Sequence, residues 1–164
     1  MKVIFLDIDG VLNCSTSKSY CCDDELGTIT GIDTDKVKKL TKIVEATNAK
    51  IILSSDWKIG WEKHYITYKP SHAKYLDNHL KKKGGLTIFD KTPTINKGWD
   101  RGAEILSYID KHQDIENYVI LDDTFFDDFL DSKIEKHLVL TDREIGLSDV
   151  DVEEAIDILM EVFK

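Results

Sequence analysis

Two carboxylates near the start of the chain, Asp7 and Asp9, are the residues whose type and spacing most directly suggest chemistry. They follow the apolar run Val3-Ile4-Phe5-Leu6, and Gly10 after them allows the backbone to turn sharply. A carboxylate beside a divalent cation can attack phosphorus and form an aspartyl-phosphate. We therefore predict Asp7 as the nucleophile, and Asp9 as the general acid and then the general base of the same reaction.

Further polar residues follow later apolar runs in the same way: Ser54-Ser55 after 51–53, Asp122-Asp123 after 118–121, and Thr141-Asp142 after 138–140. In open α/β sheets, ligands bind beyond the carboxyl ends of the strands, so the first three clusters should converge at one edge. Carboxylates gathered there repel one another unless a cation balances them. Oxygen ligands favour Mg²⁺ over zinc or copper, so we predict a magnesium site.

The same edge offers groups for a phosphoryl ligand. The hydroxyl of Ser54 and the amides that follow it, beginning at Ser55, could form a phosphate cradle. A basic side chain is also needed to balance the phosphoryl oxygens. Lys97 and Arg101 precede or open the helix that leads to the next buried strand, and either could serve.

The elements that must position these residues alternate along the chain. Apolar runs predict strands at 3–6, 50–53, 86–89, 118–121 and 138–140. Helical spacing predicts helices at about 34–48, 61–83 with a break near Pro70, 100–111 and 150–163. This order implies an α/β fold with a central parallel sheet and helices on both faces. We expect one domain over 1–164, with small insertions at about 14–32 and 57–97.

Composition limits the function classes. The 164 residues carry a formal net charge of −9, with a pI near 5.0, which counts against a general nucleic-acid binder. The three cysteines suggest reduced thiols rather than a disulfide framework. We find no signal peptide and no membrane span, and we expect a cytoplasmic protein with no membrane partner.

Taken together, the motifs resemble those of the haloacid dehalogenase (HAD) superfamily of Asp-nucleophile phosphatases. Residues 7–13 (DIDGVLN) resemble its first motif, 51–54 (IILS) its second, and 120–123 (ILDD) its fourth. The resemblance implies a Rossmann-like three-layer sandwich. It also implies that Asp7, the carbonyl of Asp9 and Asp122 ligate Mg²⁺, with Asp123 close by, and that Ser54 binds the phosphoryl group.

A narrower resemblance is to a small-cap branch that includes HAD domains associated with RNA-repair proteins, with nucleotidases and polynucleotide end phosphatases among its relatives. It lies in 31–33, 53–58, 101–105 and 141–147. The branch typically carries an Arg-Gly-x-Glu-Ile helix start, which favours Arg101 over Lys97 as the basic residue. The small insertions imply a minimal cap and an accessible site.

The function we predict is Mg²⁺-dependent hydrolysis of phosphate monoesters. An open site suits a phosphorylated substrate such as a nucleotide, a nucleic-acid end or a phosphoprotein. The principal alternative is a non-catalytic, regulatory module that binds phosphate or a partner protein on the same scaffold. Dehalogenation fits less well because it has no use for Asp9 as an acid and base, and phosphotransfer to a second substrate remains open.

Several residues near these motifs have a plainer interpretation. Asp127 and Asp128 are expected on the solvated face of a short helix, although Asp127 could assist the metal. The tryptophans at 57, 61 and 99 should pack in the core or cap, the alternative being stacking on a nucleobase. The lysines at 81–83 are expected at a solvated helix end, or alternatively as a basic rim for an anionic substrate.

Overall fold

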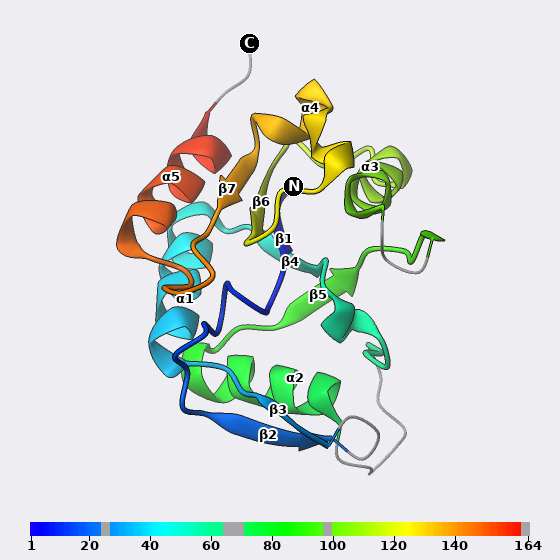
Figure 1. The fold of residues 1–164 in the computed structure, drawn as a ribbon. Coiled ribbons are helices and arrows are strands. Elements are labelled where there is room, and N and C mark those ends of the chain that lie inside the picture. Colours follow the sequence, from blue (N-terminus) through cyan, green and yellow to red (C-terminus); the bar gives the residue numbers. More distant parts are fainter. Residues whose placement is uncertain (24–26, 64–70, 97–99, 162–164) are drawn as a thin grey trace.

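The computed structural model describes residues 1–23, 27–63, 71–96 and 100–161. Its centre is a sheet of five parallel strands in the order β5-β4-β1-β6-β7 (Figure 1). The strands are β1 (Lys2–Leu6), β4 (Lys50–Leu53), β5 (Ile88–Lys91), β6 (Asn117–Asp122) and β7 (Leu138–Leu140). The strand that carries Asp7 is therefore the central one.

Helices cover both faces of this sheet (Figure 1). They are α1 (Thr34–Thr47), α2 (His72–Gly84), α3 (Arg101–Lys111), α4 (Ser132–Glu135) and α5 (Asp149–Met160). The core on one face contains apolar residues of α1, α2 and α5, and the core on the other contains those of α3 and α4. The three-layer α/β fold predicted from the alternating elements is confirmed.

Strand β1 shows why a continuous apolar run predicts a central strand of this fold. Ile4 and Leu6 pack into the core beneath α1 and α5, whereas Val3 and Phe5 pack into the opposite core beneath α3. All four side chains are fully buried. A strand whose alternating side chains meet helices on both faces has no polar face to present to solvent.

The register of the sheet lines up the ends of the strands. Leu6 of β1 pairs with Leu53 of β4 on one side and with Leu121 of β6 on the other. Because these three residues are aligned, the polar residues that follow them emerge at the same level of the same edge. The convergence of strand ends predicted from the sequence follows directly from this register.

A small cap is built from the two insertions. An antiparallel hairpin, β2 (Tyr20–Asp23) and β3 (Gly27–Thr30), lies beside α2 (Figure 1). The amide of Ile32 donates to the hydroxyl of Tyr75 in α2 at 3.1 Å. The hydroxyls of Ser17 and Ser19 donate to Asp33 at 2.5 and 3.1 Å. These contacts fix the hairpin to the helices on either side of it.

Two predicted boundaries were wrong, and one element was not predicted. Strand β5 begins at Ile88, two residues later than predicted, and its pairing with β4 contains an irregularity in register. Residues 61–63 are not helical, and the next described helix, α2, begins at His72, with Ser71 accepting from the amide of Lys74 as its cap. The hairpin β2–β3 was not predicted, because its short strands lack a buried apolar run. Pro70 lies outside the described residues.

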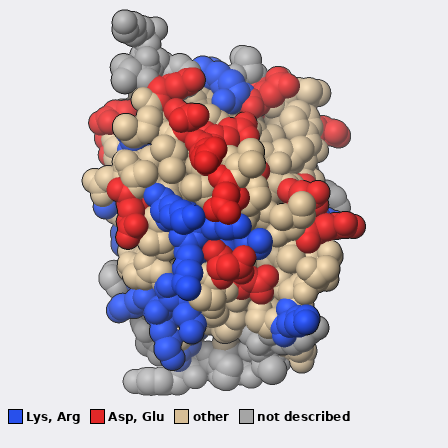
Figure 2. All heavy atoms as spheres, turned by 90° about the vertical axis from the view of Figure 1, so that its left-hand side faces the viewer, with Lys and Arg blue, Asp and Glu red and all other residues tan. Residues whose placement is uncertain are grey.

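The surface charge is uneven. On the face drawn in Figure 2, basic side chains gather in one area with acidic side chains around them, although the net charge is −9. Lys38 and Lys42 of α1 are exposed, and the end of α2 lies against α1. Lys81, Lys82 and Lys83 are exposed at that end of α2, as predicted. Among the described residues, no helix combines the length and the apolar character needed to cross a membrane.

Candidate active site

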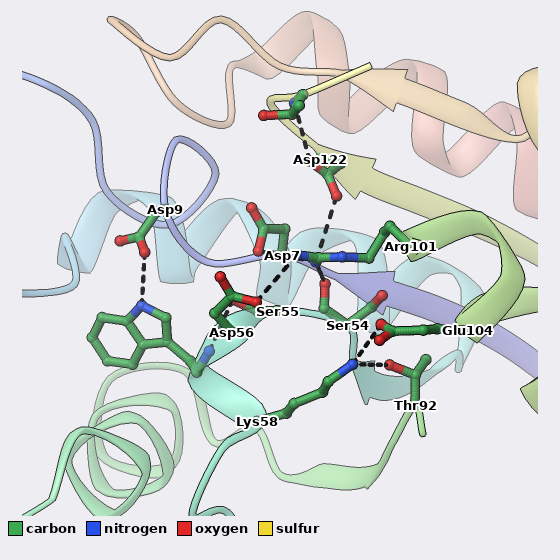
Figure 3. A network of polar contacts seen from close by, with 12 residues as sticks. Asp7, Asp9, Ser54, Ser55, Asp56, Lys58, Thr92, Arg101, Glu104 and Asp122 are labelled. Carbon is green, nitrogen blue, oxygen red and sulfur yellow. Dashed lines mark hydrogen bonds and ion pairs between the residues drawn. The ribbon is translucent and has the colours of Figure 1, made fainter. Parts of the chain in front are cut away.

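The residues that follow the three central strands lie side by side at one edge of the sheet (Figure 3). The amide of Asp7 donates to the carbonyl of Leu121 at 2.9 Å, and the amide of Ser54 donates to the carbonyl of Leu6 at 2.9 Å. These bonds extend the sheet pattern by one residue. Asp7 is therefore held between Ser54 and Asp122, and all three are at most 8% exposed.

Three carboxylates form a group that could hold a cation. One oxygen each from Asp7, Asp122 and Asp123 lies within 4.8 Å of the other two. The donors are all anionic oxygens, the ligand type that Mg²⁺ prefers. The predicted clustering of these residues is thus observed, and the donor set fits the metal that the superfamily generally uses. The side chain of Asp9 does not belong to the group.

Nearby arginines balance the negative charge of this buried group only in part. Loss of solvent raises the pKa of Asp7 to about 6, although nearby Arg101 and a hydrogen bond from Ser55 act in the opposite direction. Burial and repulsion from Asp7 raise the pKa of Asp122 to about 8. A buried carboxyl keeps its proton to higher pH when nearby positive charge does not fully balance it. The raised pKa values of Asp7 and Asp122 therefore indicate a place where a cation would be stabilising.

These shifts predict how the metal-free protein responds to pH. Above the ordinary pKa of 3.8, the carboxyl of Asp122 ionises in the unfolded chain while the folded chain keeps its proton until about pH 8. Stability from this group is therefore complete below about pH 4 and is lost as the pH rises through 8. Asp122→Asn should raise the unfolding temperature of metal-free protein at pH 8 by roughly 2–4 °C, and by less at pH 5.

Thermal unfolding in a chelating buffer measures this effect. Asp127→Asn is the matched control, because Asp127 is exposed and lies outside the carboxylate group. Its unfolding temperature should follow that of the wild type at both pH values. A lower unfolding temperature for Asp122→Asn than for the wild type at pH 8 would contradict the inference that the charge of Asp122 destabilises the metal-free protein.

Arg101 is the basic candidate that the structure places beside Asp7 and Asp122. It is the first residue of α3 and is 5% exposed. Its Nη1 donates to the carbonyl of Ser54 and lies 3.4 Å from Oδ1 of Asp7 and 3.7 Å from Oδ2 of Asp122. Its guanidinium also lies 5.2 Å from the centre of the Phe126 ring. Lys97, the other candidate, lies outside the described residues.

Among the described residues, two buried polar atoms at this site have no hydrogen-bond partner: Oγ of Ser54 and Nε of Arg101. Leaving a buried polar group unpaired costs about 1–3 kcal/mol, so such atoms need an explanation. Both belong to residues that line the same strand end as Asp7. An anion with several acceptor oxygens, such as a phosphoryl group, would satisfy both of them.

Ser55 has a supporting position. Its hydroxyl hydrogen-bonds to Asp7 and accepts from the amide of Trp57 at 3.3 Å. The second of these bonds caps a single 3-10 turn, Asp56–Lys58. The hydroxyl of Ser55 therefore forms hydrogen bonds within the protein, unlike that of Ser54. Ser55 both caps the turn and lies beside Asp7.

A buried ion pair holds the start of α3 in place. Nζ of Lys58 lies 2.5 Å from Oε2 of Glu104 and donates to Thr92 at 3.1 Å and to the carbonyl of Pro93 at 2.9 Å (Figure 3). The other oxygen of Glu104 accepts from the amide of Ile95 at 2.9 Å. Lys58 is 3% exposed and Glu104 is fully buried. One network therefore ties the end of β4, the loop after β5 and the first turn of α3, which presents Arg101.

Asp128 has a role that differs from the predicted one. Its Oδ2 accepts from the amide of Ala103 at 3.0 Å, so it caps the beginning of α3 from a different segment. A Cβ on Gly102 would approach Asp128 to 2.9 Å, so the glycine permits this contact. The predicted solvated face is wrong for Asp128, whereas Asp127 is exposed as expected.

Gly10 is required by both conformation and space. Its φ of +77° lies in the left-handed region, and a Cβ there would lie 2.2 Å from Oδ2 of Asp123. The carbonyl of Gly10 accepts from the hydroxyl of Thr141 at 2.8 Å, which ties the loop after Asp9 to the end of β7. Asp123 also accepts from Nε of the exposed Arg143 at 2.6 Å.

The tryptophans near the site are buried rather than available for stacking. Trp57 is 5% exposed and Trp61 is 3% exposed, so the expected packing in the core and cap is confirmed for both. Trp61 donates from Nε1 to Asp77 at 3.0 Å. Trp99 lies outside the described residues. Trp57 donates from Nε1 to Asp9 at 2.9 Å, a contact that sequence reasoning missed.

The Lys58–Glu104 pair and the cap formed by Asp128 were missed for the same reason. Their partners lie 46 and 25 residues apart in the chain, and no periodic pattern links them. The only available signal was that Lys58 and Glu104 fall within the two stretches, 53–58 and 101–105, that carry the resemblance to the small-cap branch.

Comparison with known proteins agrees with this geometry. The model of the family described as "HAD domain in Swiss Army Knife RNA repair proteins" matches residues 3–152. No curated protein and no solved structure matches the chain significantly. The matched range contains the central sheet except Lys2, all the candidate site residues, and every helix except the later part of α5. The chain therefore belongs to the family of HAD domains in Swiss Army Knife RNA repair proteins.

Proposed function

We propose that this domain is a Mg²⁺-dependent phosphohydrolase that cleaves phosphate monoesters through an aspartyl-phosphate on Asp7. Membership of the HAD superfamily supports a phosphohydrolase in general. The observation that carries the finer proposal is the meeting of the Asp7–Asp122–Asp123 group with Arg101, beside the unpartnered hydroxyl of Ser54.

In the first step, a carboxylate oxygen of Asp7 forms a bond to phosphorus as the bond from phosphorus to the leaving oxygen breaks. Asp9 gives its proton to that oxygen, which departs as an alcohol. The guanidinium of Arg101 offsets the negative charge on the phosphoryl oxygens, and the hydroxyl of Ser54 donates to one of them. Because Asp7 follows the central strand directly, little reorganisation is needed to aim it.

In the second step, Asp9 takes a proton from a water molecule, whose oxygen attacks phosphorus. The bond from phosphorus to Asp7 breaks, which regenerates the carboxylate and releases inorganic phosphate. Mg²⁺ held by Asp7, Asp122 and Asp123 would keep these buried carboxylates ionised and neutralise charge on the phosphoryl oxygens. The carbonyl of Asp9 is proposed as a further ligand, as the family resemblance implies.

The substrate proposed is a phosphorylated group at the end of a nucleotide or nucleic acid. The family's description, which names RNA repair, supports this choice over a phosphoprotein. The small cap of β2–β3 and α2 suits a site open to a large substrate. A panel of nucleotides, oligonucleotides phosphorylated at either end, and phosphopeptides would separate these classes by kcat/KM.

The metal requirement has a direct test. Hydrolysis of an aryl phosphate should require Mg²⁺ and be lost on chelation, and Mg²⁺ should raise the unfolding temperature of the wild type at pH 8. Asp122→Asn should weaken both effects, whereas Asp127→Asn, which changes an exposed carboxylate outside the group, should leave both intact. Stabilisation by Mg²⁺ with no hydrolysis of any ester in the panel would favour the non-catalytic binding module instead.

A further inference from the structure

Both carboxylate oxygens of Asp9 accept hydrogen bonds from side-chain donors. Its Oδ2 accepts from Nε1 of Trp57 at 2.9 Å, and its Oδ1 accepts from Nδ2 of Asn13 at 2.8 Å. Asn13 is itself fixed, because its own carbonyl oxygen accepts from the amide of Gly10 at 2.9 Å. The carboxylate is therefore held in one orientation even though Asp9 is exposed.

That orientation suits the oxygen that leaves rather than the oxygen that attacks. In Figure 3 the carboxylate of Asp9 is turned away from Asp7. In-line phosphoryl transfer places the attacking and leaving oxygens on opposite sides of phosphorus, so an acid serving the leaving group should not point at the nucleophile. Each carboxylate oxygen can accept about two hydrogen bonds, which leaves room for the transferred proton.

Trp57 is in turn held by the cap. Its indole meets the ring of His72 edge-on at 5.6 Å, and the ring of Tyr75 at 6.4 Å; both belong to α2. The hydroxyl of Tyr75 accepts from Ile32, beside the cap hairpin. The backbone of Trp57 belongs to the turn that follows Ser54 and Ser55. Trp57 therefore links the turn after β4, the cap helix α2 and Asp9.

We propose that Trp57 is a positioning residue for Asp9: its indole N–H fixes the carboxylate where it can protonate the leaving oxygen. This inference rests on the proposed phosphohydrolase function. The effect of losing the N–H should depend on how much the leaving group needs a proton. A good leaving group departs as an anion without help, whereas a poor one requires protonation in the transition state.

Trp57→Phe keeps an aromatic ring in the cluster and removes only the donor. With phenyl phosphate, a poor leaving group, kcat/KM should fall about tenfold or more, since general acid catalysis contributes about 10²–10⁴-fold and only its positioning is impaired. With p-nitrophenyl phosphate it should fall less than about threefold. The ratio kcat/KM is used because it reports the step in which the leaving group departs, before Asp9 acts as a base.

Trp61→Phe is the matched control. Trp61 is equally buried, and its indole donates to Asp77, away from the carboxylates. The same chemical change there should lower kcat/KM for both esters equally or not at all. Equal losses for the two esters in Trp57→Phe would overturn the inference and indicate a purely structural role.

A measurement without substrate separates this inference from the proposed function. In a proton–nitrogen correlation spectrum, the indole signal that disappears in Trp57→Phe should move upfield in Asp9→Ala, because its hydrogen bond is lost. The Trp61 signal should not move. An unmoved Trp57 signal would overturn the inference whatever the activity. If that signal moves but the wild type hydrolyses no ester, the positioning contact stands and the proposed function fails.

Discussion

Asp7→Asn should abolish hydrolysis of every phosphate ester, with kcat at least about 10⁴-fold below the wild type, as expected when a covalent nucleophile is removed. An amide oxygen is a poor nucleophile. The substitution also removes one charge from the group of Asp7, Asp122 and Asp123. Turnover of an aryl phosphate measures the loss. The substitution changes the shape of the side chain very little.

Stability distinguishes this loss from misfolding. Since burial raises the pKa of Asp7 to about 6, its charge opposes folding of the metal-free protein at pH 8. Asp7→Asn should therefore unfold at a temperature no lower than the wild type under those conditions. The exposed Asp127→Asn should retain full activity. Turnover that survives in Asp7→Asn would rule out Asp7 as the nucleophile.

Lys58→Met should cost about 3–5 kcal/mol of unfolding free energy, the range for breaking a buried ion pair by removing one partner. Glu104 is fully buried, and Nζ of Lys58 lies 2.5 Å from its Oε2. Burial lowers the pKa of Lys58 while Glu104 acts in the opposite direction, so each charge depends on the other. Urea or guanidinium unfolding gives the measurement.

Two further variants make this test specific. Lys42→Met is the matched control, because Lys42 forms an exposed pair with Asp149 at 3.2 Å and should cost less than about 1 kcal/mol. In Lys58→Met/Glu104→Gln, the uncompensated charge is gone, so much of the lost stability should return. Equal costs for Lys58→Met and Lys42→Met would contradict the role assigned to the buried network.

The centre of the fold and the carboxylate group could be predicted from the sequence for a simple physical reason. A strand buried on both faces is a continuous apolar run, and parallel strands in register bring their carboxyl ends to one edge. Asp7, Ser54 and Asp122 are each the first residue after, or the last residue of, such a run. Local patterns were therefore enough to bring these three together.

The contacts that refine the site depend on geometry that no local pattern encodes. Trp57 reaches Asp9 across 48 residues of sequence, and Asp128 caps α3 from a segment 25 residues further on. A tryptophan is by default expected in a core, and paired aspartates are expected in a solvated turn. The choice of Arg101 needed the family resemblance, because spacing alone left Lys97 equally suitable.

The most direct test of the account is to identify the phosphorylated intermediate. Asp9→Asn, which lacks the base for the second step, should be mixed with p-nitrophenyl phosphate and Mg²⁺, quenched in acid and examined by mass spectrometry. The account predicts one added phosphoryl group on the peptide that contains residue 7, and none in the Asp7→Asn/Asp9→Asn double variant. A phosphoryl group on any other residue, or release of nitrophenol by Asp9→Asn in a rapid first turnover without any labelled peptide, would contradict it.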